Sequence, residues 1–228
     1  MDKSLPKKIG IVTIGQSPRP DVVKDMKLFW GDHVEVLECG ALDELTIEQV
    51  TELYPENEMV HLVTRMRDGT EVVIAKEKIL PFIDACICSL NREKVDLILL
   101  LCVGNFPEFE SLCLVIEPQK IVNNIVEGLV SNKHHLGVII PIKEQQSWVR
   151  ASFSSVTSNI HITSISPYSD KSNVISACEL IQKEDCHVIL LYCMGFDLEL
   201  ANQIRQITGK PVILSNTIVA RVVGELLA

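Results

Sequence analysis

A nine-residue segment occurs twice in this chain, and the duplication constrains the fold more than any other feature of the sequence. Residues 96–104 read DLILLLCVG, residues 187–195 read HVILLYCMG, and the two align without a gap. Each copy is an apolar run rich in Ile, Leu and Val, which is typical of a fully buried strand of a parallel sheet. The repeat therefore predicts two similar α/β halves.

Both copies end in Cys-x-Gly, so Cys102 and Cys193 are expected at the carboxyl ends of their strands. In open α/β sheets this edge is where ligands bind. Gly104 and Gly195 allow the backbone to turn sharply and to approach a ligand closely. A free cysteine is more often a small buried hydrophobe, but the matched context favours two functional thiols that face one cleft.

The rest of the chain alternates strand and helix patterns. In the first half we expect strands at 7–15, 34–39 and 96–102, and helices from Ser17-Pro18-Arg19-Pro20 to about Phe29, at 47–53 and at 76–92. Thr46 and Gln49 have the spacing of a capping box. Two alternating runs flank Asp68-Gly69 and predict a β-hairpin over 61–75.

The second half repeats this scheme. Strands are expected at 136–142, 161–166, 187–193 and 211–214, and helices at 118–131, 143–155, 170–184, 197–207 and 216–227. Strands that alternate with helices predict two similar doubly wound parallel-sheet domains, with the hairpin as an appendage of the first. We place the N-terminal domain at 1–112 and the C-terminal domain at 113–213, and we leave open whether residues 214–228 complete the N-terminal domain.

The composition of the chain limits the classes of molecule that the protein is expected to bind. The formal net charge is −9, aromatic residues make up 5% of the chain, and no basic run is present. These features argue against nucleic acid and anionic membranes and favour a small-molecule partner. No apolar run reaches the length of a membrane span, and Pro6, Lys7 and Lys8 interrupt any signal-peptide pattern. We therefore expect a cytoplasmic protein.

The eight cysteines show no CxxC spacing, so in a reducing cytoplasm all of them are predicted to be free thiols. The histidines show no HxxxH or HxH spacing, and Gly10 and Gly15 lack the lysine that a phosphate-binding loop needs. The sequence therefore predicts no metal site and no cofactor.

Polar residues follow several of the predicted strands. The loop after the first strand contains Thr13, Gly15, Gln16, Ser17 and Arg19, whose amide and guanidinium groups suit a carboxylate. Asn105 follows the first Cys-x-Gly, and Ser215 and Asn216 follow the last strand. Ordinary helix capping or turn formation also explains Ser17, Asn105, Ser215 and Asn216. Arg65 is either a solvated residue of the hairpin or a positive charge near the site.

Seven segments together carry a resemblance to a known family. The chain resembles the AroM family of bacterial proteins over essentially its whole length, in IGIVTIGQSPRPD (9–21), GALDEL (40–45), LVTRMRDGTEV (62–72), LLCVGNFPEF (100–109), LGVIIP (136–141), YCMGFD (192–197) and PVILSNTIVARVVGELL (211–227). That family is similar in turn to the aspartate/glutamate racemase superfamily. The resemblance implies two α/β domains with a cleft between them and one cysteine from each domain beside the substrate α-carbon.

Carried onto this chain, the resemblance places the two thiols at Cys102 and Cys193 and the substrate-binding first loop at Gly15, Gln16 and Ser17. It implies a cofactor-independent racemase-like or isomerase-like enzyme that acts on a small carboxylate or related carbonyl compound. Racemases usually continue the two cysteines with Asn-Thr and Thr-His, whereas here Val103 and Met194 follow them. This difference leaves open a binding or sensor protein that kept the cleft without the chemistry.

The hairpin supplies one further expectation. An isolated two-stranded ribbon is marginally stable in water and must pack either on its own cleft, as a lid, or on another subunit. Its alternating Leu62, Thr64 and Met66 form an apolar face, which favours a homo-oligomer interface, with Arg65 or Arg67 reaching toward the cleft.

Overall fold

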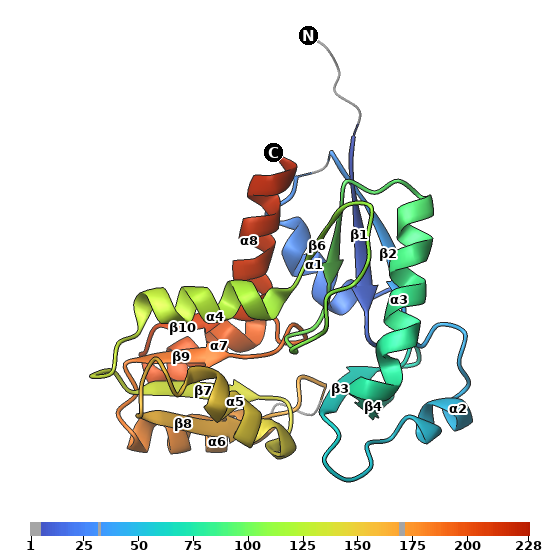
Figure 1. Cartoon of the computed structure of the whole chain (residues 1–228). Helices are drawn as coiled ribbons and strands as arrows, with labels where there is room; N and C mark the ends of the chain where they lie inside the picture. Colours follow the sequence, from blue (N-terminus) through green and yellow to red (C-terminus); the bar gives the residue numbers. More distant parts are fainter. Residues whose placement is uncertain (1–5, 32, 169–171) are drawn as a thin grey trace. The chain divides into compact units, whose positions relative to one another are not determined.

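Two four-stranded parallel sheets, one in each half of the chain, form the framework of the structure (Figure 1). The computed structural model describes residues 6–31, 33–168 and 172–228. The chain divides into two compact units. Unit 1 comprises Met1–Pro118 and Ala220–Ala228, and unit 2 comprises Gln119–Val219.

Unit 1 contains the hairpin and the first sheet. Its elements are β1 (Lys7–Thr13), α1 (Pro20–Lys27), β2 (Val34–Gly40), α2 (Ile47–Glu52), β3 (His61–Arg65), β4 (Glu71–Ala75), α3 (Lys76–Arg92), β5 (Leu97–Leu100) and β6 (Leu114–Ile116). The predicted capping box is present, because Thr46 accepts from the backbone of Gln49 while the Gln49 side chain accepts from the backbone of Thr46. The helix expected after Ser17 instead begins at Pro20, with Arg19 at its N-cap.

Unit 2 contains the second sheet. Its elements are α4 (Pro118–Leu129), β7 (Leu136–Ile140), the 3-10 helix η1 (Lys143–Gln145), α5 (Gln146–Phe153), β8 (Ile160–Ser164), α6 (Ser172–Lys183), β9 (Val188–Leu191), α7 (Leu198–Thr208), β10 (Val212–Leu214) and α8 (Ser215–Leu227). The predicted start of α6 at residue 170 lies outside the described residues. Helix α8 begins in unit 2 and ends in unit 1.

The two sheets have the same topology. Their orders are β2-β1-β5-β6 and, read in the same direction, β8-β7-β9-β10, and all pairings within them are parallel. The duplicated apolar runs form β5 and β9, which hold the same place in the two sheets. The predicted α/β class, with two parallel sheets and a hairpin, is confirmed.

Equivalent glycines set the helix packing in both units. A Cβ at Gly10 of β1 would lie 2.9 Å from a methyl group of Leu90 in α3, and a Cβ at Gly137 of β7 would lie 2.9 Å from a methyl group of Ile181 in α6. Both strands therefore admit a close helix only because a side chain is missing there. The packing thus repeats along with the topology.

The hairpin packs on its own unit. Strands β3 and β4 pair in antiparallel register, and Leu62, Met66 and Ile74 are buried in the core of unit 1. The backbone N–H of Gln16 donates to the carbonyl oxygen of Arg65 at 3.1 Å. The Leu62 and Met66 side chains are therefore covered within unit 1, and a homo-oligomer through the hairpin stays a prediction.

One pair of cysteines differs from the prediction of free thiols. Cys39 of β2 and Cys86 of α3 form a disulfide, with their Cα atoms 5.6 Å apart. No local sequence pattern signals this pair, since 47 residues separate its members. The remaining described cysteines are free thiols: Cys88, Cys102, Cys113, Cys178, Cys186 and Cys193.

The C-terminal part of α8 packs against the end of α1. The indole Nε1 of Trp30 donates to the carbonyl oxygen of Ala220 at 3.0 Å, and the Arg221 guanidinium lies 4.3 Å from the centre of the Phe29 ring.

Among the described residues, no helix has both the length and the apolar character needed to cross a bilayer. The cytoplasmic location stays a prediction.

Candidate functional site

Cys102 and Cys193 leave equivalent strands of the two sheets. Cys102 lies two residues beyond β5 and is buried, while Cys193 lies two residues beyond β9 and is half-buried. Each packs on the apolar core of its own unit. The sequence duplication therefore corresponds to a structural equivalence within each sheet.

The segment after Cys102 folds back over the sulfur atom. A Cβ at Gly104 would lie 2.8 Å from the Phe106 ring and 3.6 Å from the Cys102 Sγ atom, so a side chain at this position would crowd the ring and touch the thiol. The ammonium of Lys76 donates to the carbonyl oxygen of Asn105 at 3.2 Å and ties the segment to the start of α3. Asn105 itself is exposed.

In unit 2 a backbone donor points at the thiol. The N–H of Gly195 lies 3.3 Å from the Cys193 Sγ atom, and such a donor stabilises negative charge on sulfur. A Cβ at Gly195 would lie 3.0 Å from the Tyr168 hydroxyl and 3.2 Å from Pro167. Tyr168 was not predicted as a site residue, and only the fold brings it to this turn.

A helix follows only one of the two cysteines. Residues 101–113 contain no helix, whereas α7 begins five residues after Cys193, with the Asp197 carboxylate accepting the backbone N–H of Leu200 at 2.8 Å. A helix start therefore lies close behind the thiol in unit 2 alone.

Ser215 and Asn216 occupy the first turn of α8 and are fully buried. The Ser215 hydroxyl donates to the carbonyl oxygen of Leu191 at 2.7 Å, and the Asn216 amide donates to the carbonyl oxygen of Met194 at 3.4 Å. Both side chains therefore fix the segment on either side of Cys193.

In unit 1 the loop between β1 and α1, which we call the β1 loop, lies beside the segment that contains and follows Cys102, which we call the Cys102 segment. The N–H of Leu101 donates to the carbonyl oxygen of Val12 at 2.7 Å, so Thr13 and Cys102 leave neighbouring strands at the same edge. The Gln16 amide donates to the carbonyl oxygens of Leu42 and Leu45 and accepts the N–H of Arg67 at 2.8 Å. These contacts make Gln16 a clamp between the β1 loop and the hairpin.

Asp43 organises the same loop, and the sequence did not single it out. Its carboxylate accepts the N–H and the hydroxyl of Ser17 at 2.7 and 2.6 Å, the N–H of Gly40 at 2.8 Å and the Arg67 guanidinium at 3.1 Å. The only sequence signal was its place in the GALDEL segment.

Arg19 is buried and its guanidinium forms a bidentate ion pair with Asp21, in which Nε and Nη2 donate to the two carboxylate oxygens at 3.0 and 2.9 Å. Burial of the Asp21 carboxyl opposes its ionisation, but the hydrogen bonds and charge of Arg19, together with the charge of Arg65, outweigh this and lower the pKa of Asp21. Arg65 lies 3.9 Å from the same carboxylate and donates to the carbonyl oxygen of Gly69 at 3.0 Å.

A buried hydroxyl lies beside the loop. Thr64 of β3 is 1% exposed, and its hydroxyl has no hydrogen-bond partner among the described residues. A Cβ at Gly15 would collide with this hydroxyl and would lie 2.5 Å from the carbonyl oxygen of Arg65. Gly15 therefore allows the loop to lie directly against the hairpin.

The predicted site residues thus form one group in each unit. Unit 1 brings together Thr13, Gly15, Gln16, Ser17, Arg19 and Arg65 on the loop and hairpin, with Cys102, Gly104 and Asn105 after the neighbouring strand. Unit 2 brings together Cys193, Gly195, Ser215 and Asn216. Within the described ranges, no group of three or more His, Cys, Asp or Glu side chains is placed to hold a metal ion.

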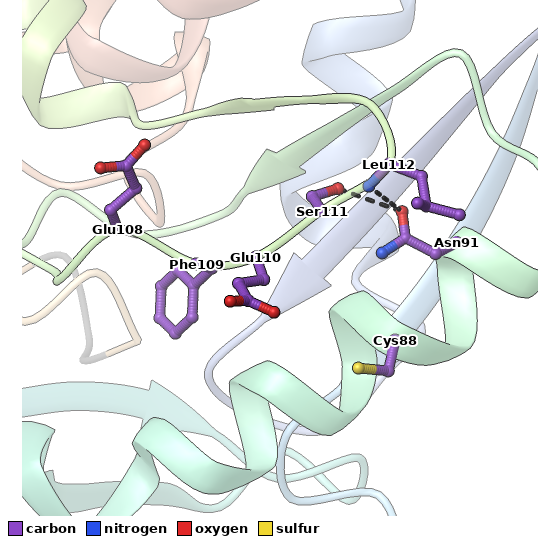
Figure 2. Close-up of a pocket in the computed structure, with 7 residues that line it drawn as sticks. All are labelled: Cys88, Asn91, Glu108, Phe109, Glu110, Ser111 and Leu112. Atoms are coloured by element: carbon purple, nitrogen blue, oxygen red, sulfur yellow. Dashed lines mark hydrogen bonds between the residues drawn. The ribbon is translucent and has the colours of Figure 1, made fainter.

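A separate pocket of about 760 Å³ lies in unit 1. Figure 2 shows it between α3 and the segment 108–112, and its lining residues are Cys88, Asn91, Glu108, Phe109, Glu110, Ser111 and Leu112. Asn91 accepts the Ser111 hydroxyl at 3.0 Å and the N–H of Leu112 at 3.1 Å. None of the predicted site residues lines this pocket.

Solved structures that are similar to this chain include enzymes. The chain is similar to an aspartate racemase from Picrophilus torridus (15% identity, TM-score 0.60, covering 97% of this chain and 94% of that chain). It is also similar to a glutamate racemase from Aquifex pyrophilus (16%, 0.60, 96% and 83%) and to an unliganded arylmalonate decarboxylase (12%, 0.58, 97% and 92%). At these identities the likeness establishes the fold alone.

No curated protein matches this chain in sequence. The sequence pattern of the AroM family, described as AroM protein, matches residues 9–227. That range includes both cysteine segments, the β1 loop, Asp43 and the hairpin. The chain therefore belongs to the AroM family.

Proposed function

We propose that this protein is a cofactor-independent enzyme that transfers a proton at the α-carbon of a small carboxylate or related carbonyl compound. The observation that carries the proposal is the pair of equivalent strands, β5 and β9, each followed by a cysteine and a close-packed glycine. Duplicated thiols suit this chemistry because one acts as base while the other acts as acid.

The proton transfer balances without a cofactor. The thiolate of one cysteine removes the α-proton and becomes a thiol, and the electron pair of the C–H bond moves into the carboxylate or carbonyl as an enolate. The other thiol then donates its proton to the α-carbon and becomes a thiolate. The N–H of Gly195 stabilises the thiolate form of Cys193.

The hydrogen bonds divide the remaining residues into two roles. Gln16 and Asn216 donate to backbone carbonyls of their own units, so we assign them to positioning the β1 loop and the Cys193 segment. Asn105 is exposed at the end of the Cys102 segment, and we assign it to hydrogen bonding with the substrate. The folds named as racemases and as a decarboxylase are consistent with this class of reaction.

A second candidate is a metabolite-binding or sensor protein without turnover. It is favoured by the apolar residues Val103 and Met194 after the two cysteines and by the loop residues, since Gln16, Ser17 and Arg19 bind partners within unit 1. A loop whose polar groups are already paired offers fewer of them to a substrate.

Solvent-exchange NMR separates the two candidates. The full-length protein is incubated in D₂O with a panel of α-substituted carboxylates, dicarboxylates and hydantoins. We expect deuterium at the α-carbon of at least one compound, and a loss of at least about 100-fold in C102S and in C193S. The control C178S removes a buried core thiol and keeps the wild-type rate.

The contrary result is equally specific. Thermal stabilisation by a compound whose α-proton never exchanges, in the wild type and in both serine variants, supports the binding protein. A crystal structure with a bound carboxylate adds a geometric requirement: each sulfur atom lies about 3–3.5 Å from one carbon, on opposite faces. If the sulfur atoms of Cys102 and Cys193 face different cavities, the enzyme proposal is wrong.

A further inference from the structure

The Cys39 and Cys86 pair joins β2, whose end borders the β1 loop, to helix α3. Cys39 is the second-last residue of β2, and Cys86 lies in the middle of α3. Cys39 is half-buried, whereas Cys86 is 4% exposed and belongs to the core of unit 1. A small thiol or disulfide therefore reaches the sulfur atom of Cys39 first.

The residues directly after Cys39 hold the loop. The N–H of Ala41 donates to the carbonyl oxygen of Thr13 at 2.9 Å, and the N–H of Leu42 donates to that of Gly15 at 3.1 Å. A Cβ at Gly40 would lie 2.5 Å from the backbone nitrogen of Ser17, so the two segments are in close backbone contact. A bond from Cys39 to α3 therefore restrains the segment that contacts the β1 loop.

The other buried thiols differ from this pair. Burial raises the pKa of the Cys178 thiol, and burial together with the nearby Glu184 carboxylate raises the pKa of Cys186 to about 11. Both therefore stay protonated and unreactive at neutral pH. Cys88 is an exposed thiol on the same helix as Cys86 and stays free.

We infer that Cys39 and Cys86 form a reversible disulfide. The bond orders the β1 loop in oxidising surroundings, and its reduction loosens the loop. The reaction partner is a small disulfide such as oxidised glutathione. The inference does not depend on the proposed proton transfer, because it concerns the loop and no reacting carbon.

The exchange balances in two steps. The Cys39 thiolate attacks the small disulfide, which gives a mixed disulfide and releases one thiolate. The Cys86 thiolate then attacks the Cys39 sulfur and releases the second thiolate. Two protein thiols lose two protons and two electrons, and one small disulfide becomes two thiols. Excess small thiol reverses both steps.

The first test measures the bond itself. The full-length protein is equilibrated with reduced and oxidised glutathione over a range of ratios, quenched by alkylation and analysed by peptide mass spectrometry. We expect a peptide that links residues 39 and 86 to form and to disappear reversibly in the folded protein. If both residues stay alkylatable under the most oxidising buffer, or if the link resists excess reduced glutathione in the folded protein, the switch is overturned.

The second test measures the coupling to the loop. Hydrogen exchange is followed for amides in 13–19 and 38–45 in the oxidised and the reduced protein. We expect exchange at Ala41 and Leu42 to slow by about tenfold or more on oxidation. C39S and C86S should match the reduced protein under both conditions, while C88S should respond like the wild type. Equal exchange in the two states of the wild type contradicts the coupling, whether or not the bond forms.

Discussion

The carboxylate of Asp43 accepts both the backbone N–H and the hydroxyl of Ser17, at 2.7 and 2.6 Å. The same carboxylate also accepts the N–H of Gly40 and the guanidinium of Arg67. One side chain thus joins the β1 loop, the end of β2 and the hairpin. Its charge is shared by four donors, so its removal affects all three segments together.

Replacing Asp43 by alanine should therefore lower the free energy of unfolding by about 2–4 kcal/mol, because several donors lose a charged acceptor. Asp43→Asn keeps the shape and should cost less. Urea denaturation measures both, with E44A, which removes an exposed carboxylate at the next residue, as the control. A D43A protein as stable as E44A would mean that water replaces the carboxylate at no cost.

Thr13 and Thr64 provide a matched pair of buried hydroxyls. The Thr13 hydroxyl accepts the N–H of Gly15 at 3.3 Å and the Arg19 guanidinium at 3.5 Å, whereas the Thr64 hydroxyl has no partner within the described part of the chain. Thr13→Val should cost about 1–2 kcal/mol of unfolding free energy, while Thr64→Val should be neutral or stabilising by up to about 1 kcal/mol. Equal losses in the two variants would show that Thr64 binds a group of its own.

Gly15 and Gly128 form a second matched pair. A Cβ at Gly15 meets Thr64 and the backbone of Arg65, whereas a Cβ at Gly128 of α4 meets no described atom within 4 Å outside the backbone of its own helix. Gly15→Ala should therefore destabilise by about 1–3 kcal/mol, and Gly128→Ala should stabilise by about 0.5–1 kcal/mol. Thermal unfolding tests both, and a tolerated G15A would mean that the loop moves freely off the hairpin.

The Arg19 and Asp21 pair should contribute a pH-dependent part of the stability. The pKa of Asp21 is lower in the folded protein than its ordinary value of 3.8. The stabilisation is therefore complete above that value and is lost as the pH falls through the lower folded pKa. When unfolding is measured from pH 6 to pH 2, the free energy of unfolding of D21N should be lower than that of the wild type at pH 6. This difference should disappear toward pH 2. A constant deficit across this range would argue against the ion pair.

The thiols should differ in alkylation rate at neutral pH. The pKa of Cys186 is raised to about 11, so its thiolate is about 100-fold rarer than that of an ordinary cysteine. We expect Cys193 and Cys102 to react with iodoacetamide at least about 100-fold faster than Cys186, as followed by peptide mass spectrometry, and a bound carboxylate to protect them. If Cys102 and Cys193 become reactive only in denaturant, they are packing residues.

The sequence alone determined the elements and their repetition. Apolar runs such as 97–101, the spacing of Thr46 and Gln49, and Asp68-Gly69 act over a few neighbouring residues, so strands, a capping box and a hairpin follow from local chemistry. Strand β6 was missed because three residues, Leu114–Ile116, are too few to show a period. The second cysteine segment was predictable because it repeats the first.

Only the tertiary structure decided the partners of the polar and sulfur groups. Gln16 turns to Leu42 and Arg67, Asp43 to Ser17, and Cys39 to Cys86, across 26 to 51 residues of chain. No local pattern encodes these pairs, because a buried polar group takes whichever partner the parallel strands bring to the same sheet edge. The sequence therefore proposed the residues of the candidate site, and the packing of the β1 loop against the hairpin decided which of them hold the loop in place.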